Sequence, residues 1–174
     1  ASEDSSEALK KSKELDGIST KINEVELKAK KVFPHLNDLI LQNAIARFFN
    51  ISSIVITNAV RTNDFKDFID LLEAIKNSIK ACKNDSEHTI HDNSEFKNTI
   101  HGFALFLETE RFRFQTIFKT REENKSFEDL IECLKKLEMS NEQDVSSNYD
   151  TTTDQIESII NIIGKKNVTT ESAA

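Results

Sequence analysis

The most apolar part of this chain is residues 36–60, LNDLILQNAIARFFNISSIVITNAV, which carry only two charged side chains. Four of the polar residues, Asn43, Arg47, Asn50 and Thr57, fall on one narrow line at helical spacing. A helix that is apolar around most of its circumference has neighbours on several sides. The pattern therefore predicts one long helix at the centre of a bundle. A membrane span is disfavoured, because polar residues interrupt the run and no apolar block of about 20 residues survives.

Other parts of the chain place apolar residues three and four positions apart, as an amphipathic helix does. In chain order the stripes are Leu15, Ile18, Ile22, Val25, Ala29 and Val32; Phe65, Phe68, Leu72, Ile75, Ile79 and Cys82; Phe96, Ile100, Phe103, Leu107, Phe114 and Phe118; Phe127, Leu130, Leu134 and Leu137; and Ile156, Ile159, Ile160 and Ile163. The chain has only three Gly and one Pro, too few for the tight turns of a β-rich domain. We therefore predict a single all-α domain over residues 8–164, a bundle of five or six helices around the central one.

Helix boundaries are marked by capping residues. The expected capping boxes are Asp92 with Glu95, Ser126 with Asp129 and Thr152 with Gln155. Gly164 is expected to end the last helix, since glycine is favoured just past a helix C-terminus. Residues 139–151 are acidic and rich in Ser and Asn, which predicts a flexible loop, and we expect residues 1–7 and 165–174 to be disordered.

The stripe beginning at Phe96 is accompanied by apolar residues that do not belong to it. At 100° per residue, Leu105 and Phe112 point roughly opposite to the stripe, and Phe106 lies to one side. Two interpretations follow. Either this helix is sandwiched between two layers of the core, or it presents an aromatic surface to a ligand or partner.

The net charge of −7 changes the range of expected partners. A phosphate backbone and an anionic membrane surface both require clustered basic residues. Nucleic acid and anionic membranes are therefore disfavoured as partners.

Two cysteines, Cys82 and Cys133, lack the spacing of a zinc site. Both lie at or beside the apolar face of a predicted helix, so we expect them to form a disulfide in an oxidising compartment. The small, acidic N-terminus resembles a mature secreted chain. Asn50, Asn84, Asn124 and Asn167 each begin a glycosylation sequon. Together these features predict an extracellular glycoprotein.

The sequence contains few of the motifs that indicate an enzyme. His88 and His91 are three residues apart with His101 ten further on, but the pair lies in a predicted polar loop, so we predict no metal site. The chain has no glycine-flanked nucleophile and no glycine-rich phosphate loop. We expect neither an enzyme nor a cofactor.

The run Arg111-Phe112-Arg113-Phe114 is the most local basic-aromatic cluster, and neighbouring glutamates neutralise it. Arg and Phe are favoured at protein interfaces, so we take Leu105, Phe106, Arg111, Phe112 and Arg113 as candidate binding residues. Two functions follow: a secreted interaction protein that binds a protein partner through a helical face, or a carrier that holds a fatty acid or other lipid in a Phe/Ile-rich interior.

Overall fold

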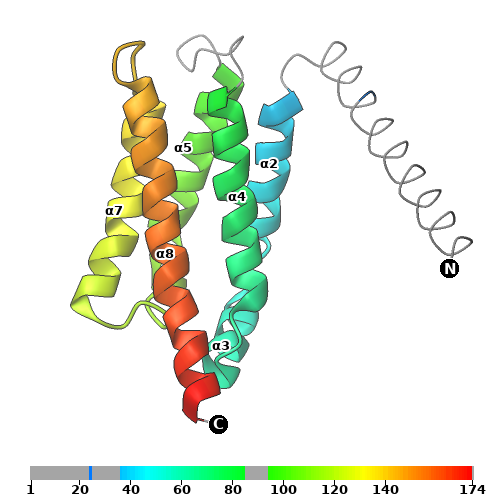
Figure 1. Ribbon diagram of the computed structural model, residues 1–174, viewed down its shortest axis with the longest axis vertical. Helices are drawn as coiled ribbons and strands as arrows, with labels where there is room; N and C mark the ends of the chain where they lie inside the picture. The colour runs from blue at the N-terminus through cyan, green and yellow to red at the C-terminus, as the bar shows by residue number, and fades with distance from the viewer. Residues whose placement is uncertain (1–23, 25–35, 85–93, 174) are drawn as a thin grey trace, which may run out of the picture. The chain divides into compact units, whose positions relative to one another are not determined.

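The structure, a computed structural model, describes residues 24, 36–84 and 94–173, with side chains as far as Asn167. Every regular element in these ranges is an α-helix (Figure 1), which confirms the predicted all-α class. The helices are α2 (Leu36–Phe49), α3 (Ser53–Thr62), α4 (Lys66–Asn84), α5 (Ser94–Thr109), α6 (Arg111–Phe114), α7 (Arg121–Glu138) and α8 (Val145–Ala173). The stripe from Leu15 to Val32, the segment 1–7, and Asp92 with its cap lie outside the described residues. By its internal contacts the chain divides into residues 1–36 and 37–174, and the fold below is that of the second unit.

The helices α4, α5, α7 and α8 alternate in direction and form an antiparallel bundle (Figure 1). Helix α8 packs against α7 and α4, and α7 also packs against α5. All four predicted stripes that fall on these helices and on α6 are buried: each of their apolar residues, from Phe65 to Ile163, is at most 7% exposed. The stripes therefore predicted the core of the bundle correctly.

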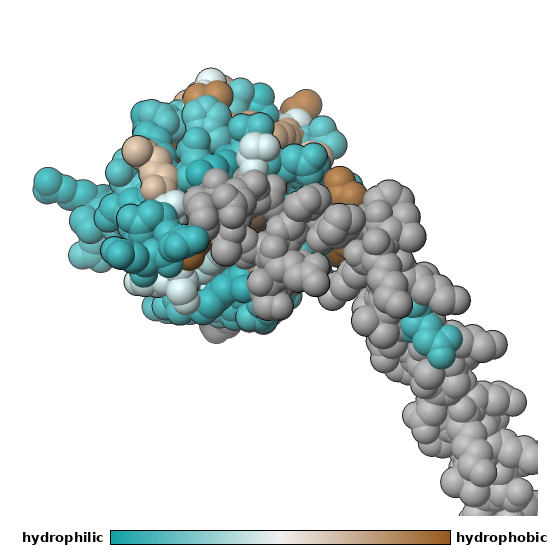
Figure 2. Space-filling view, turned by 90° about the horizontal axis from the view of Figure 1, so that it is seen from above, coloured by the Kyte–Doolittle hydropathy of each residue, from teal (hydrophilic) through white to brown (hydrophobic). Residues whose placement is uncertain are grey.

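Helix α2 lies beside this bundle and is joined to α4 by polar contacts. Nδ2 of Asn37 donates to the carbonyl of Ala81 at 3.3 Å. Seen from above, the end of the bundle at the α7–α8 turn is mainly hydrophilic, with a few separate hydrophobic residues (Figure 2). The coloured part of this end therefore presents no broad apolar surface.

The prediction of one continuous helix over residues 36–60 is wrong. Helix α2 ends at Phe49, α3 begins at Ser53, and their axes differ by 75°. Ser52 causes the break in part, because its Oγ accepts the backbone N–H of Val55 at 3.2 Å and so caps a new helix. The bend turns Ile51 and Ile56 into the core, where both are buried. The predicted central position of this stretch is not confirmed: among the described residues, α2 leaves Leu39 and Ile40 exposed.

Phe48 of α2 is the centre of the aromatic core. Its ring lies 5.6 Å from the ring centres of Phe68 on α4 and Phe103 on α5, and it stacks at 5.9 Å on Phe114 of α6. The space among these rings and their aliphatic neighbours amounts to about 10 Å³. That is at the lower limit for one water molecule, about 10–15 Å³. The interior is therefore filled by side chains.

Helix α7 begins earlier than the sequence analysis predicted. The capping box is Thr120 with Glu123 and not Ser126 with Asp129. Oγ1 of Thr120 accepts the N–H of Glu123 at 3.1 Å, and Oε1 of Glu123 accepts the N–H of Thr120 at 3.2 Å. Ser126 lies inside the helix, and its carbonyl accepts a hydrogen bond at 2.8 Å from Nε2 of Gln155 on α8.

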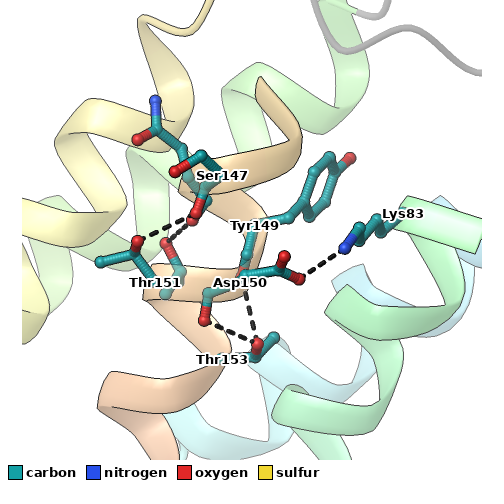
Figure 3. A network of polar contacts seen from close by, with 8 residues as sticks. Lys83, Ser147, Tyr149, Asp150, Thr151 and Thr153 are labelled. Carbon is teal, nitrogen blue, oxygen red and sulfur yellow. Dashed lines mark hydrogen bonds and ion pairs between the residues drawn. The ribbon is translucent and has the colours of Figure 1, made fainter. Parts of the chain in front are cut away.

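Most of the predicted flexible loop at 139–151 is the start of α8. Asn141 and Asp144 cap this helix reciprocally: Oδ1 of Asn141 accepts the N–H of Asp144 at 3.1 Å, and Oδ1 of Asp144 accepts the N–H of Asn141 at 2.7 Å. Along the first turns the threonine hydroxyls donate to carbonyls one turn back, such as Thr151 to Ser147 at 2.9 Å (Figure 3). The hydroxyls of this Ser/Thr-rich segment therefore find acceptors within the helix itself.

Helix α8 also extends beyond its predicted end. It passes through Gly164 and continues to Ala173, so Gly164 does not end it and residues 165–173 are helical. Ion pairs join α8 to α4: Lys83 pairs with Asp150 (Figure 3), and Nζ of Lys76 lies 2.6 Å from Oε2 of Glu157. The hydrogen bond from Lys76 to Glu157 raises the pKa of Lys76 above 10.5, although burial acts in the opposite direction.

The predicted disulfide is absent, and both cysteines are free thiols. Cys82 is buried, and its Sγ–H donates to Oδ1 of the buried Asp38 on α2, 3.6 Å away. Cys133 lies on α7, and its carbonyl accepts a hydrogen bond from Thr152 of α8 at 3.3 Å. The two cysteines thus contact different neighbouring helices, α2 and α8, and not each other.

Candidate functional site

Large apolar side chains are exposed at a few places in the described part of the chain. They are Leu39, Ile40, Phe49, Ile54, Val55, Leu105, Phe112 and Met139. Five of these eight belong to α2 or α3, the stretch that we expected to be the most buried. Ile54 is the extreme case within that stretch, with 77% of its surface exposed. Phe49, Ile54 and Val55 lie close together in the sequence on either side of the bend, whereas Leu39 and Ile40 lie near the start of α2. Contiguous exposed apolar groups are typical of a surface that another molecule covers.

The end of α2, all of α3, and α6 meet at one place, which we call the α2–α6 corner. It comprises Phe49, Ile51, Ile54, Val55, Phe106, Phe112 and Arg113. Helix α3 packs against α6. Phe49 of α2 lies 4.6 Å, ring centre to ring centre, from Phe106 of α5.

Arg113 holds α6 to the bend between α2 and α3. Its Nη1 donates to the carbonyl of Ile51 at 2.9 Å, a carbonyl that lies between the two helices. Its Nε lies 2.9 Å from Oε2 of Glu110, an ion pair at an angle unsuited to a hydrogen bond. The guanidinium also lies 5.9 Å from the ring centre of Phe112, within the range of a cation–π contact. Arg113 therefore supports the corner structurally, and Phe112 is left facing outward.

A groove runs between α3 and the first turns of α4, beside the corner. We call it the α3–α4 groove. Its volume is about 280 Å³. The residues that line it are Ile51, Val55, Ile56, Asn58, Ala59, Thr62, Asp64, Asp67, Phe68 and Leu71. Six of the ten are apolar, and the polar ones include two carboxylates but no basic residue.

The groove exists because the chain turns sharply between α3 and α4. Asn63 ends α3 in the left-handed conformation, with φ 53° and ψ 33°, which asparagine tolerates better than most residues. The next N–H groups are bonded: Asp64 donates to the carbonyl of Ala59 at 3.1 Å, and Phe65 donates to Oδ1 of Asn167 on α8 at 3.0 Å. The short α3 is thereby held at an angle to the bundle.

The five predicted binding residues have different environments. Leu105 and Phe112 are 53% and 58% exposed, so the surface interpretation fits both. Phe106 is half-buried and packs edge-on against Phe48 and Phe114, so the core interpretation fits it. Arg111 turns to α7, where its Nη2 lies 2.9 Å from Oε2 of Glu128. The structure therefore brings Phe106, Phe112 and Arg113 to the corner and directs Arg111 away from it.

Sequence reasoning missed the α3–α4 groove entirely. Its lining residues lie within residues 51–71, and the first ten of these positions belong to the stretch predicted to be one long central helix. Ser52 and Asn63, a favoured N-cap and a residue that tolerates the left-handed conformation, were the signals for a separate short helix.

The groove between α2 and α5 is a second hollow, of about 470 Å³, and it is more polar. Gln42, Ala46 and Phe49 form one side, and Asn98 and Gly102 belong to the other. Phe49 therefore borders both this hollow and the corner.

No metal-binding arrangement occurs in the described residues, where no three His, Cys, Asp or Glu side chains are grouped to hold an ion. Of the histidines considered earlier, His88 and His91 lie outside the described ranges. Nδ1 of His101 lies 3.1 Å from the Glu138 carboxylate. This is a surface contact between α5 and α7.

The four sequon asparagines differ in accessibility. Asn50 and Asn84 are exposed, whereas Asn124 and Asn167 are half-buried on helices. Oδ1 of Asn167 is already an acceptor for the N–H of Phe65. Asn84 at the end of α4 is thus the most accessible acceptor away from the corner.

Within the described ranges, no single helix has the length and apolar composition to cross a membrane; α2 and α3 meet those criteria only together, and they are bent by 75°. Comparison of the chain with protein-family models, with curated proteins and with solved structures finds no match.

Proposed function

We propose that this protein is a non-enzymatic, extracellular binding protein that engages a protein partner through the α2–α6 corner. The supporting observation is the concentration of exposed apolar side chains on α2, α3 and α6 beside a formed groove. Interface centres are apolar and rich in aromatic residues such as Phe. Phe112, Ile54 and Val55 are the anchors in this proposal.

The location outside the cell rests on the sequons. A glycan on Asn50 would compete with a partner for the corner, because Asn50 is exposed next to Phe49 and Ile51. We therefore assign the glycan to Asn84. Enzymatic deglycosylation of protein from its natural source should lower the mass by one glycan, mapped to Asn84. An unmodified Asn84 would remove the support for this location.

The carrier of a hydrophobic ligand is the alternative, and the packing favours it less. Pockets for such ligands usually measure about 300–1,000 Å³, whereas the aromatic interior leaves about 10 Å³. A fatty acid would enter only if the helices separated. Native mass spectrometry of naturally sourced protein distinguishes the two functions, since retained lipid would favour the carrier.

A photo-crosslinking residue, benzoylphenylalanine, placed at Phe112 or at Ile54 tests the binding function in the fluid from which the protein is isolated. The control carries it at Glu132, an exposed residue of α7. We expect one protein adduct from the two corner positions and none from Glu132. An excess of unlabelled protein should compete for the adduct, and an excess of Phe112→Ser/Ile54→Ser protein should not. Equal adducts at all three positions, or competition by the double variant, would contradict the proposal.

A further inference from the structure

We infer that the α3–α4 groove receives a large apolar side chain from a partner segment that also carries Lys or Arg next to it. This inference rests on the proposed function and specifies the chemistry of the partner. The groove has an apolar floor and an acidic edge, and these two features select different parts of one segment.

The floor of the groove is built from buried residues of the core. Ile51, Ile56 and Phe68 are at most 7% exposed and belong to the core, while Val55 is 52% exposed at the opening. A volume of about 280 Å³ lies just below the range of pockets for whole small molecules, about 300–1,000 Å³. The space therefore suits one or two side chains better than an entire lipid.

Asp64 and Asp67 provide the acidic edge. Neither carboxylate forms an ion pair with any residue in the described ranges, and both side chains are exposed. Oδ1 of Asp64 only accepts the N–H of Lys66, at 3.3 Å. The nearest basic group on α3, Arg61, donates to Oδ1 of Asn58 at 2.9 Å. A cation on the partner can therefore approach two carboxylates that have no other ionic partner.

The remaining polar groups of the edge are mostly satisfied within α3. The hydroxyl of Thr62 donates to the carbonyl of Asn58 at 2.8 Å. The carboxylates of Asp64 and Asp67 are acceptors only, and ionised acceptors pair with the donor-only side chains Lys and Arg. Charge complementarity thus favours a basic, partly apolar peptide segment over an acidic one.

The test is selection of a random peptide library on the immobilised full-length chain, followed by titration of synthetic peptides. Enriched peptides should combine a large apolar residue with neighbouring Lys or Arg. Asp64→Asn/Asp67→Asn should weaken their binding by about three- to tenfold, because two exposed ion pairs are lost. Added salt should weaken binding to the wild type more than to this variant.

Two further variants define the site. Ala59→Phe, which fills the groove, should abolish peptide binding while the circular dichroism spectrum is unchanged. Asp70→Asn removes a carboxylate of α4 that does not line the groove, and it should leave the affinity unchanged. If Ala59→Phe fails to fold, the test still has a comparison between two variants. Weaker peptide binding by Asp64→Asn/Asp67→Asn, but not by Asp70→Asn, would support the acidic edge as the binding site.

Several outcomes would overturn the inference. The first two are enrichment of peptides without basic residues, and an affinity of the Asp64→Asn/Asp67→Asn variant equal to that of the wild type. The other two are displacement of the peptide by oleate, and a dimer of this chain that Ala59→Phe dissociates. If any of these outcomes is observed but the crosslinks at Phe112 and Ile54 persist, only the groove inference fails. If the groove binds basic peptides but no partner is crosslinked, the proposed corner interface fails instead.

Discussion

Single phenylalanines show how the same residue type serves two purposes in this protein. Phe103 is fully buried, in edge-to-face contact with Phe48, whereas Phe112 is 58% exposed on α6. The two residues lie nine positions apart in a segment that the sequence assigned to one helix. Because the two side chains are chemically identical, their burial decides whether each contributes to the stability of the core or to the surface.

Phe103→Ala should lower the free energy of unfolding by about 3–5 kcal/mol, because it leaves a cavity among rings that fill the core. Phe112→Ala should change it by about 0.5 kcal/mol or less, since little buried contact is lost. Chemical denaturation of both variants measures the difference. A large loss for Phe112→Ala would show that this ring belongs to the core after all.

Gly164 lies inside α8 and has no positive φ. A Cβ at this position would meet nothing within 4 Å. Gly164→Ala should therefore stabilise the protein by roughly 0.5–1 kcal/mol, because alanine loses less backbone entropy in a helix. The expected result is a higher denaturation midpoint. A lower midpoint would mean that the helix ends at Gly164 in the left-handed conformation.

At the scale of elements, the start of α7 is fixed by charge as well as by capping. Burial raises the pKa of Glu123, but the hydrogen bond from Lys166 and the backbone N–H of Thr120 outweigh it, so the pKa lies below its ordinary 4.5. Nζ of Lys166 on α8 lies 2.8 Å from Oε2 of Glu123. The same carboxylate therefore caps α7 and attaches it to α8.

Glu123→Gln keeps a capping side chain and removes the charge. Because the pKa is lowered in the folded state, the ionised Glu123 stabilises the protein fully above the unfolded pKa of about 4.5, and this contribution is lost as the pH falls through the folded value. The variant should be less stable by about 0.5–1 kcal/mol at neutral pH. Thermal melts over a pH series should show the two proteins converging in acid. A constant difference at every pH would contradict this account.

The bend between α2 and α3 is the element-scale feature with the largest consequence. In a straight helix over residues 36–60, Ile51 and Ile56 would continue in the direction of α2. The 75° bend changes the direction of the chain, and both side chains are buried in the core. It also leaves Ile54 and Val55 facing solvent and opens the groove against α4. The proposed binding surface is thus a result of this break.

At the scale of the whole molecule, the bundle is held together by its apolar stripes and supplemented by polar contacts between neighbouring helices. Lys135 of α7 pairs with Glu108 of α5 at 3.0 Å, and Lys76 of α4 pairs with Glu157 of α8 at 2.6 Å. Partly exposed pairs of this kind contribute modestly. No disulfide supplements them in the described residues.

Both cysteines should therefore titrate as thiols in denaturant, two per chain, and reducing agent should not change the melting temperature. In the folded protein Cys82 should resist alkylation because it is 1% exposed. Burial raises the pKa of Cys133 above 9.0, so its alkylation by iodoacetamide should still accelerate above pH 9, since the thiolate is the nucleophile. A single disulfide-linked peptide on non-reducing mapping would contradict the structure.

The candidate site was only partly predictable. Leu105 and Phe112 were identified as apolar residues opposite the stripe, and both are exposed. Phe106 was grouped with them but packs inward, because Phe49 and Phe48 from α2 cover it. Helical spacing gives the direction of a side chain and not the identity of its neighbour. For the groove, Ser52 and Asn63 indicate a separate short helix, but helical spacing does not give its position against α4.

What the sequence determined by itself is the all-α class and the inward faces of the helices, because helical periodicity is local and each stripe needs only its own residues. The tertiary structure decided the burial and the extent of the elements, even where a local cap such as Ser52 contributed. It bent the most apolar stretch at Ser52 and exposed part of it. It extended α8 through Ser/Thr-rich residues, where Thr152 also bonds to α7. Burial and such bonds depend on which helix lies alongside, and that information is distributed over the whole chain.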